Sequence, residues 1–234
     1  ALDHAGIHND TKVSINFVNS EKLDTKNYKK ALKKSDAILV PGGFGNRGIE
    51  GMILAAKYAR ESKTPFFGIC LGLQIAIIEM TRSLLNLKDA NSTEFKKRVK
   101  NNVISLVTEW KNEDGTIEKR NHKSDKGGTM RLGAQVAFLK NGTLAKSLYK
   151  KSSIFERHRH RYEVNPSYVP KLDKHGLVVS ARSEMHNLVE MIELKNHPWF
   201  VACQFHPEFT SKPKKGHPLF NDFIRAAEIK RSKK

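Results

Sequence analysis

The sequence has little cysteine and no long apolar run. Its two cysteines, Cys70 and Cys203, form neither a CxxC pair nor a zinc-ligand spacing, so we expect no metal site. A disulfide framework would be thin for 234 residues, and the cytosol is therefore the expected compartment. The longest apolar run, Leu73 to Ile78, is interrupted by Gln74 and is far shorter than the roughly 20 residues of a membrane span. The first residues also lack the features of a secretory signal, and we expect no membrane partner.

Acidic residues are few relative to basic ones. The 42 Lys and Arg outnumber the 24 Asp and Glu, which gives a net charge of +18. Such an excess is typical of proteins that bind polyanions, and also of proteins from lysine-rich proteomes. The basic residues form short clusters without any RNP, helix-turn-helix or zinc-finger pattern. We therefore expect most of them to lie on solvated faces, and we expect no nucleic-acid partner.

The first half of the chain alternates between strand and helix patterns. Period-two alternation predicts a strand at Val13–Val18, and two short apolar runs before turns predict buried strands. Because these runs are apolar throughout, they indicate a parallel sheet that is covered on both faces. The buried strands are expected at Asp36–Val40 and Pro65–Ile69, and the helices at Lys26–Lys34, Ile49–Glu61 and Leu71–Leu84.

The second half is richer in strands separated by turns. The strands are expected at Val103–Val107, Leu132–Leu139, Leu177–Ala181, Leu188–Leu194 and Trp199–Phe205, and a helix at Leu219–Ile229. A polar stretch, Lys111–Thr129, separates the first two of these strands. We expect one α/β domain over residues 1–229, with a mostly parallel central sheet flanked by helices and an antiparallel region in the second half. Residues 230–234 are expected to be a basic, disordered tail.

The sharpest local motif surrounds Cys70. A buried strand leads directly into this cysteine, a helix begins after it, and Gly68 and Gly72 flank it. This is the pattern of a nucleophile elbow, in which only glycine lets the neighbouring backbone pass close to a strained residue. The start of the helix also favours a thiolate. A buried core cysteine is the alternative, but the strand–GxCxG–helix context favours a nucleophile. We interpret Cys203, within an apolar strand, as core packing.

A cysteine nucleophile needs a base and a group that orients the base. An apolar strand ends at His206, and Glu208 follows two positions later. Because residues i and i+2 of an extended segment point the same way, Glu208 can hold one imidazole nitrogen while the other faces Cys70. Alone, this spacing would more often be a surface ion pair; beside the elbow, it predicts a Cys-His-Glu triad.

Two adjacent glycines follow the first buried strand. Pro41-Gly42-Gly43 exposes backbone N–H groups that no side chain covers, which suits an oxyanion hole with the Leu71 N–H as second donor. A simple glycine turn is the alternative. Phosphate binding is disfavoured, since neither a GxxxxGK[ST] nor a correctly placed GxGxxG motif is present.

These motifs resemble those of class I, triad-type glutamine amidotransferases, which have a flavodoxin-like fold. Four further segments are similar to the glutaminase domains of the CTP synthase family. They are residues 89–95, residues 123–133, residues 156–165 and residues 196–200. The resemblance covers nearly the whole chain.

The resemblance implies a definite chemistry. Cys70 would attack the side-chain carboxamide of L-glutamine, His206 with Glu208 would move the proton, and the N–H groups of Gly43 and Leu71 would hold the oxyanion. Water would then hydrolyse a γ-glutamyl thioester. The glutamine-binding residues implied by the motifs are Gly43, Leu71, Gly72, Leu73, Gln74, Glu94 and Arg161, with Gln74, Glu94 and Arg161 at the α-amino and α-carboxylate ends.

The resemblance also implies partners outside this chain. In the family, ammonia passes to a synthetase domain of the same polypeptide, which binds ATP, UTP and Mg²⁺ and makes CTP, while GTP activates the glutaminase step; the full enzyme is a homotetramer. No cofactor is expected in this domain itself. We expect the synthetase domain to be absent here, together with the first strand and most of the first helix of the glutaminase domain.

Other interpretations apply to parts of the sequence. Residues 157–161, Arg-His-Arg-His-Arg, could be a metal site or a nucleic-acid stripe, but an alternating strand would separate the histidines from the arginines. We favour a substrate role for Arg161 and structural roles for the rest. Residues 111–132 are either a solvated hairpin or, as the resemblance implies, a lid with flexible Gly127 and Gly128. A stand-alone γ-glutamyl hydrolase and a basic nucleic-acid-binding module remain the alternative functions.

Overall fold

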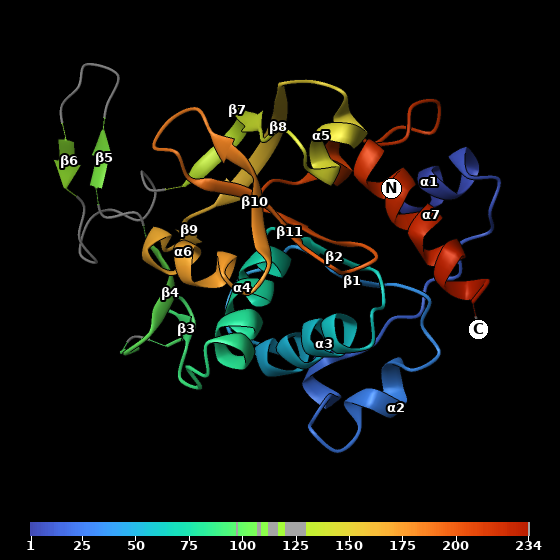
Figure 1. Ribbon diagram of the computed structural model, residues 1–234, viewed down its shortest axis with the longest axis horizontal. Coiled ribbons are helices and arrows are strands. Elements are labelled where there is room, and N and C mark those ends of the chain that lie inside the picture. The colour runs from blue at the N-terminus through green and yellow to red at the C-terminus, as the bar shows by residue number, and fades with distance from the viewer. Residues whose placement is uncertain (97, 107–108, 112–116, 120–129, 234) are drawn as a thin grey trace.

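The computed structural model describes residues 1–96, 98–106, 109–111, 117–119 and 130–233. In this part of the chain, a mixed sheet of seven strands crosses the middle of the molecule (Figure 1). Its spatial order is β1 (Ile38–Val40), β2 (Phe66–Ile69), β12 (Phe200–Cys203), β11 (Val189–Leu194), β10 (Leu177–Ser183), β7 (Arg131–Leu139) and β8 (Ser153–His160). The expected lid glycines, Gly127 and Gly128, lie outside the described residues.

Helices cover both faces of this sheet and enclose two apolar cores (Figure 1). One core lies beneath α2 (Tyr28–Leu32), α3 (Ile49–Glu61), α4 (Leu71–Leu84) and α6 (Val169–Asp173). The other lies beneath α1 (Leu2–His8), α5 (Leu144–Tyr149) and α7 (Pro218–Arg231). The first and last helices, α1 and α7, lie side by side, and Asn9 Nδ2 donates to the carbonyl of Asn221 at 2.9 Å.

Smaller elements complete the described fold. A second sheet joins β3 (Asn91–Ser92), β4 (Asn102–Leu106) and β9 (Tyr162–Val164), and a third pairs β5 (Glu109–Lys111) with β6 (Ile117–Lys119). Short 3₁₀ turns are η1 (Ser20–Lys22), η3 (Pro166–Tyr168) and η4 (Pro207–Thr210). None of the helices in the described ranges is long and apolar enough to cross a membrane.

The predicted α/β architecture is confirmed, with helices on both faces and antiparallel strands in the second half. The sheet is more mixed than expected. The β1–β2 and β2–β12 pairings are parallel, while the pairings from β12 through to β8 are antiparallel. Short connections account for two of these antiparallel pairings: residues 184–188 join β10 to β11 and residues 195–199 join β11 to β12, whereas a parallel crossover needs about a dozen residues or more.

The prediction of a strand at Val13–Val18 is wrong. This segment has no strand assignment, and the Phe17 side chain is 90% exposed. Alternation indicates a strand only where a neighbouring strand supplies hydrogen bonds, and no described strand pairs with this segment. The prediction of a disordered tail is also wrong for Lys230 and Arg231, which lie in α7. The Lys230 ammonium donates to the carbonyl of Ser62 at 3.0 Å, which ties the end of the helix to the turn after α3.

Candidate active site

Cys70 occupies the tight turn between β2 and α4. Its backbone has φ 52° and ψ −99°, an unfavourable conformation for a residue with a side chain. The Cys70 N–H donates to the Cys203 carbonyl at 2.7 Å, which extends the β2–β12 pairing to the turn. The flanking glycines allow the close approach, because a Cβ at Gly72 would lie 2.2 Å from the Val40 carbonyl oxygen and one at Gly68 would lie 2.6 Å from the Gly72 oxygen.

The Cys70 side chain is held as a thiol by its surroundings. It is 2% exposed, and burial raises its pKa to about 12, with the Leu71 N–H opposing the shift. The thiol therefore keeps its proton at neutral pH. A base must remove that proton before the sulfur becomes a strong nucleophile.

His206 and Glu208 form the predicted pair. His206 Nδ1 and Glu208 Oε1 are 2.6 Å apart, and the His206 backbone N–H donates to the Arg157 carbonyl at 2.8 Å. The imidazole also stacks on Phe209, with ring centroids 5.1 Å apart. With Nδ1–H bound to the carboxylate, Nε2 is the nitrogen that can accept a proton. Nε2 is buried and has no hydrogen-bond partner among the described residues.

Gly42 shows that this imidazole lies beside Cys70. A Cβ on residue 42 would stand 2.6 Å from His206 Cε1 and 3.6 Å from Cys70 Cβ. The imidazole ring and Cys70 therefore both lie against the backbone of Gly42, where even one methyl group would displace the ring. The turn after β1 thus makes room for the cysteine–histidine pair.

A pocket opens beside Cys70. It is lined by Gly43, Phe44, Cys70, Gln74, Glu94, His160, Arg161 and Tyr162. Glu94 Oε1 accepts the Gly45 N–H at 2.9 Å, and burial raises the pKa of Glu94, while the Gly45 N–H and the charge of Arg161 oppose that shift. Gln74 Nε2 donates to the Tyr162 carbonyl at 3.2 Å, and its buried Oε1 has no partner in the described part of the chain. The pocket therefore offers a carboxylate, a guanidinium and an amide.

The structure brings most of the predicted site residues together. Gly43, Cys70, Gln74, Glu94 and Arg161 line the pocket, and His206 and Glu208 adjoin it. The first turn of α4 contains the other three. A Cβ at Gly43 would meet the Leu71 side chain at 3.0 Å, so these two predicted oxyanion donors are neighbours. The side chain of Leu73 is fully buried in the core instead, and Gly72 packs against Val40.

A buried polar network lies behind the pocket. Arg131 Nη1 donates to Glu163 Oε1 at 3.0 Å and Arg131 Nη2 to Glu190 Oε1 at 2.6 Å. His158 Nδ1 and His160 Nε2 are 3.0 Å apart, and Glu190 lies 3.5 Å from His158. As expected, alternation along β8 places both histidines inside and Arg157 and Arg159 outside.

Burial sets the protonation of this network. It lowers the pKa of His158 to about 3 and that of His160 well below its ordinary value, and nearby Arg131 acts in the same direction. Burial raises the pKa of Glu163 to about 8, against the pull of Arg131. The histidines are therefore neutral, and Arg131 donates hydrogen bonds to the carboxyl groups of both Glu163 and Glu190. Among the residues that the structure describes, no three His, Cys, Asp or Glu side chains are arranged so that they could hold a metal ion.

The family model for class-I glutamine amidotransferases matches residues 1–226. The chain belongs to this family. The amidotransferase is also similar to the glutaminase domain of Trypanosoma brucei CTPS solved with bound acivicin. The two share 37% identity with a TM-score of 0.87, over 97% of this chain and 85% of that one. A protein from Thermoplasma acidophilum that is assigned to GMP synthase shares the fold, with 17% identity and a TM-score of 0.56 over 99% and 89% of the two chains.

Sequence reasoning missed several residues of the amidotransferase site. Phe44, His160 and Tyr162 line the pocket, and Gln204 contacts the Cys70 sulfur. Phe44 follows the Gly42-Gly43 turn, and the burial of His160 follows from the alternation of β8. Gln204 precedes His206 by two positions, at the end of the strand that pairs with β2. The pairing of β12 with β2 would have placed Gln204 beside Cys70, but a single sequence does not show which strands pair.

Proposed function

We propose that this amidotransferase is the glutaminase domain of a CTP synthase. It hydrolyses L-glutamine through Cys70, His206 and Glu208. The observation that carries the proposal is one pocket that combines the strained cysteine with Glu94 and Arg161, beside the histidine–glutamate pair. The 37% identity to a CTPS glutaminase domain supports the choice of this family branch.

The first half of the reaction forms the thioester. The Cys70 proton moves to His206 Nε2, and the sulfur attacks the side-chain carbonyl carbon of glutamine. The carbonyl oxygen becomes an oxyanion, which the N–H groups of Gly43 and Leu71 stabilise. The intermediate then collapses, the C–N bond breaks, and the proton on His206 leaves with the nitrogen as ammonia. The γ-glutamyl group remains on sulfur.

The second half releases glutamate. His206 takes a proton from a water molecule, whose oxygen attacks the thioester carbon. The C–S bond breaks, the sulfur regains a proton from His206, and the site returns to its starting state. Glu208 keeps the imidazole in the required tautomer through both halves, because its carboxylate holds Nδ1–H.

The charged side chains of the pocket orient the substrate. The ammonium of glutamine is complementary to Glu94, and its α-carboxylate is complementary to the Arg161 guanidinium. Gln74 supplies an additional polar contact through its amide. Burial of Glu94 strengthens such pairing, since both charges then interact with little water between them.

The ammonia is passed to the synthetase domain of the same polypeptide, which uses ATP and Mg²⁺ to aminate UTP to CTP in pyrimidine nucleotide biosynthesis. GTP activation, a homotetrameric full enzyme and a cytosolic location also remain predictions. No cofactor is assigned to this domain.

The test is glutamate formation from L-glutamine by the polypeptide that includes its synthetase domain, with a γ-glutamyl peptide as competing substrate. We expect glutamine hydrolysis that depends on Cys70, CTP formation from glutamine, and negligible peptide cleavage. Efficient cleavage of γ-glutamyl peptides without CTP formation would instead identify a γ-glutamyl hydrolase.

A further inference from the structure

Gln204 lies directly against the nucleophile. Strands β2 and β12 are parallel neighbours in which Ile69 pairs with Cys203, so Cys70 and Gln204 each follow the last residue of adjacent strands. Residues at the carboxyl ends of neighbouring parallel strands meet at one edge of the sheet. Here the two side chains are in direct contact, since Gln204 Nε2 is 3.8 Å from Cys70 Sγ.

The Gln204 side chain has little else to bind. It is fully buried, and the sulfur is its one hydrogen-bond partner in the described part of the chain. Its Oε1 has no partner among the described residues. Buried amides are normally satisfied by several hydrogen bonds, so an amide whose single partner is the reacting sulfur needs an explanation beyond packing. The backbone of Gln204 is fixed separately, since its N–H donates to the Glu190 carbonyl at 2.8 Å.

The surroundings of Cys70 oppose ionisation of the thiol. Glu163, Glu208 and Glu94 all disfavour a negative sulfur, and burial acts in the same direction. The Leu71 N–H at the start of α4 favours a negative sulfur. The imidazole of His206 and the Gln204 amide also lie beside Cys70. Of these, the Leu71 N–H is also required by the oxyanion, so the sulfur needs a donor that does not serve the substrate.

We propose that Gln204 is a catalytic residue that stabilises the Cys70 thiolate by donating its Nε2–H to Sγ. During thioester formation, the Cys70 proton goes to His206 while Gln204 keeps its own, so its role is electrostatic. When the thioester breaks, the same N–H stabilises the departing sulfur. The catalytic consequence rests on the proposed glutaminase function, whereas the contact with the thiol does not.

The test measures the reactivity of Cys70 without any substrate. The intact protein is treated with iodoacetamide between pH 7 and pH 10, and alkylation of Cys70 and Cys203 is followed by peptide mapping. The variants are Gln204→Met, which keeps the length and loses the donor, and Gln204→Asn, whose amide is one methylene too short. The control is Ser180→Ala, which removes a buried hydroxyl in β10, two strands away from β12.

Loss of a hydrogen bond to a charged sulfur predicts alkylation of Cys70 that is about tenfold slower at pH 9 in Gln204→Met. In Gln204→Asn we expect most of the same slowing of Cys70 alkylation, and in Ser180→Ala we expect no change in the alkylation rate. Rates within about twofold of wild type in both Gln204 variants would overturn the proposal. Because Cys203 is buried in the folded protein, its alkylation indicates unfolding. If Gln204→Met is unfolded by this criterion, the alkylation rate of Gln204→Asn tests the proposal.

Glutamate formation is measured on portions of the same proteins that have not been treated with iodoacetamide. If wild type shows no hydrolysis while the alkylation differences persist, the proposed function fails and the thiol contact stands. If wild type hydrolyses glutamine and the alkylation rates do not change, the assignment of Gln204 alone fails. The expected result is a tenfold loss of kcat in Gln204→Met with KM little changed, because Gln204 does not line the pocket.

Discussion

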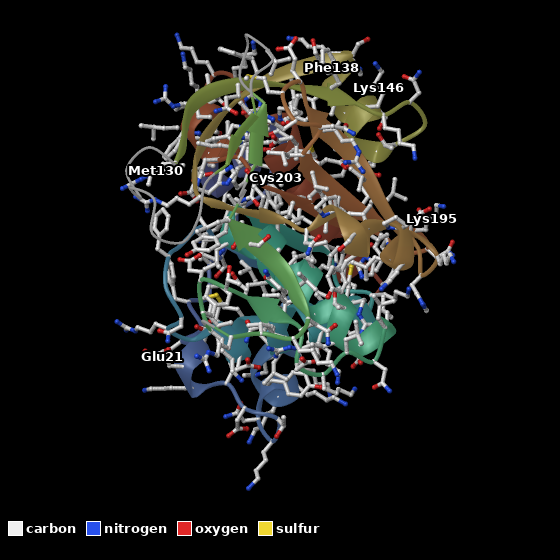
Figure 2. All side chains as sticks on the ribbon, turned by 90° about the vertical axis from the view of Figure 1, so that its left-hand side faces the viewer. Glu21, Met130, Phe138, Lys146, Lys195 and Cys203 are labelled. Carbon is white, nitrogen blue, oxygen red and sulfur yellow. The ribbon has the colours of Figure 1, made fainter. Side chains whose placement is uncertain are left out.

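The turn after β2 and the strand β12 each carry one buried cysteine, and comparing the two shows how the proposed nucleophile differs from a cysteine of the core. Cys203 is the last residue of β12, Cys70 directly follows the last residue of the neighbouring parallel strand β2, and the Cys70 N–H donates to the Cys203 carbonyl. Both are almost inaccessible, and burial raises the pKa of both thiols. Figure 2 shows Cys203 in the middle of the molecule, whereas Glu21 and Lys195 lie at its edge.

The difference lies in the backbone and the neighbours. Cys203 is in a regular strand, where its thiol donates to the Phe205 carbonyl at 3.4 Å. Cys70 has a positive φ, begins a helix and faces a pocket with a histidine beside it. Burial therefore does not distinguish a nucleophile from a core residue. The turn does, because it places Cys70 beyond the end of the strand and beside the pocket.

The largest expected effect comes from removing each sulfur in turn. Cys70→Ala should lower glutamate formation by on the order of 10⁴-fold or more, since the thioester cannot form. Cys203→Ala should stay within about twofold, because it removes only core contacts. The measurement is a glutaminase assay at saturating glutamine. Equal losses in both variants would remove the distinction between the two cysteines.

The next largest effect is expected from a substitution at Glu208, the residue that orients the proposed base His206. Glu208→Gln keeps the shape of the side chain but no longer holds the imidazole tautomer by a carboxylate, and we expect kcat to fall by about 10²- to 10⁴-fold. Glu184→Gln, at an exposed position, is the matched control and should be unchanged. A Glu208→Gln enzyme with full activity would exclude Glu208 from the triad.

A methyl group at position 42 should lower the catalytic rate much more than it lowers the melting temperature. In Gly42→Ala the new Cβ would meet His206 Cε1 at 2.6 Å, so the ring must move away from Cys70. Because small displacements of catalytic groups are costly, we expect kcat to fall about 10²-fold. Thermal melting is expected to change much less. If kcat is unchanged, the imidazole does not act from this position.

The smallest effect is electrostatic and depends on pH. Glu163 lies near Cys70, whereas Glu156 lies near Cys203, and a negative charge disfavours a thiolate beside it. Burial raises the pKa of Glu163, so its carboxylate charge appears only as the pH rises. Glu163→Gln should therefore speed alkylation of Cys70 by about threefold at alkaline pH, with less effect at lower pH, and leave Cys203 unchanged.

The matched variant is Glu156→Gln, which removes a carboxylate near the buried Cys203 and should leave the alkylation rate of Cys70 unchanged. Iodoacetamide alkylation, resolved by cysteine and by pH, checks both variants. A response of Cys70 to Glu156→Gln that equals its response to Glu163→Gln would show that the two thiols are not separately controlled.

The nucleophile elbow could be predicted because its signals are local. An apolar strand, two glycines and a helix start are adjacent in the sequence, and the structure has β2 ending at Ile69 and α4 over Leu71–Leu84 as expected. The His206–Glu208 contact was also predicted, but the reason given for it was wrong, because Glu208 lies in the 3₁₀ turn η4 and not in an extended segment. Both inferences needed only the residues next to each side chain.

Long-range packing explains what could not be predicted. The Gln204–Cys70 contact depends on β12 pairing with β2, although the two residues are far apart in the sequence. The charge balance around Glu163 depends on Arg131 and Glu190 from two other strands. Val13–Val18 shows the opposite failure, since its local pattern is correct for a strand but no described neighbour pairs with it.

The central claim is that Cys70 is the nucleophile of an assembled glutamine pocket, and covalent trapping tests it most directly. The protein is treated with a diazo-ketone that mimics glutamine, and adducts are located by intact-mass spectrometry and peptide mapping. We expect one adduct, on Cys70, which excess L-glutamine prevents, and none on Cys203. An adduct on Cys203, or labelling of Cys70 that glutamine does not affect, would contradict it.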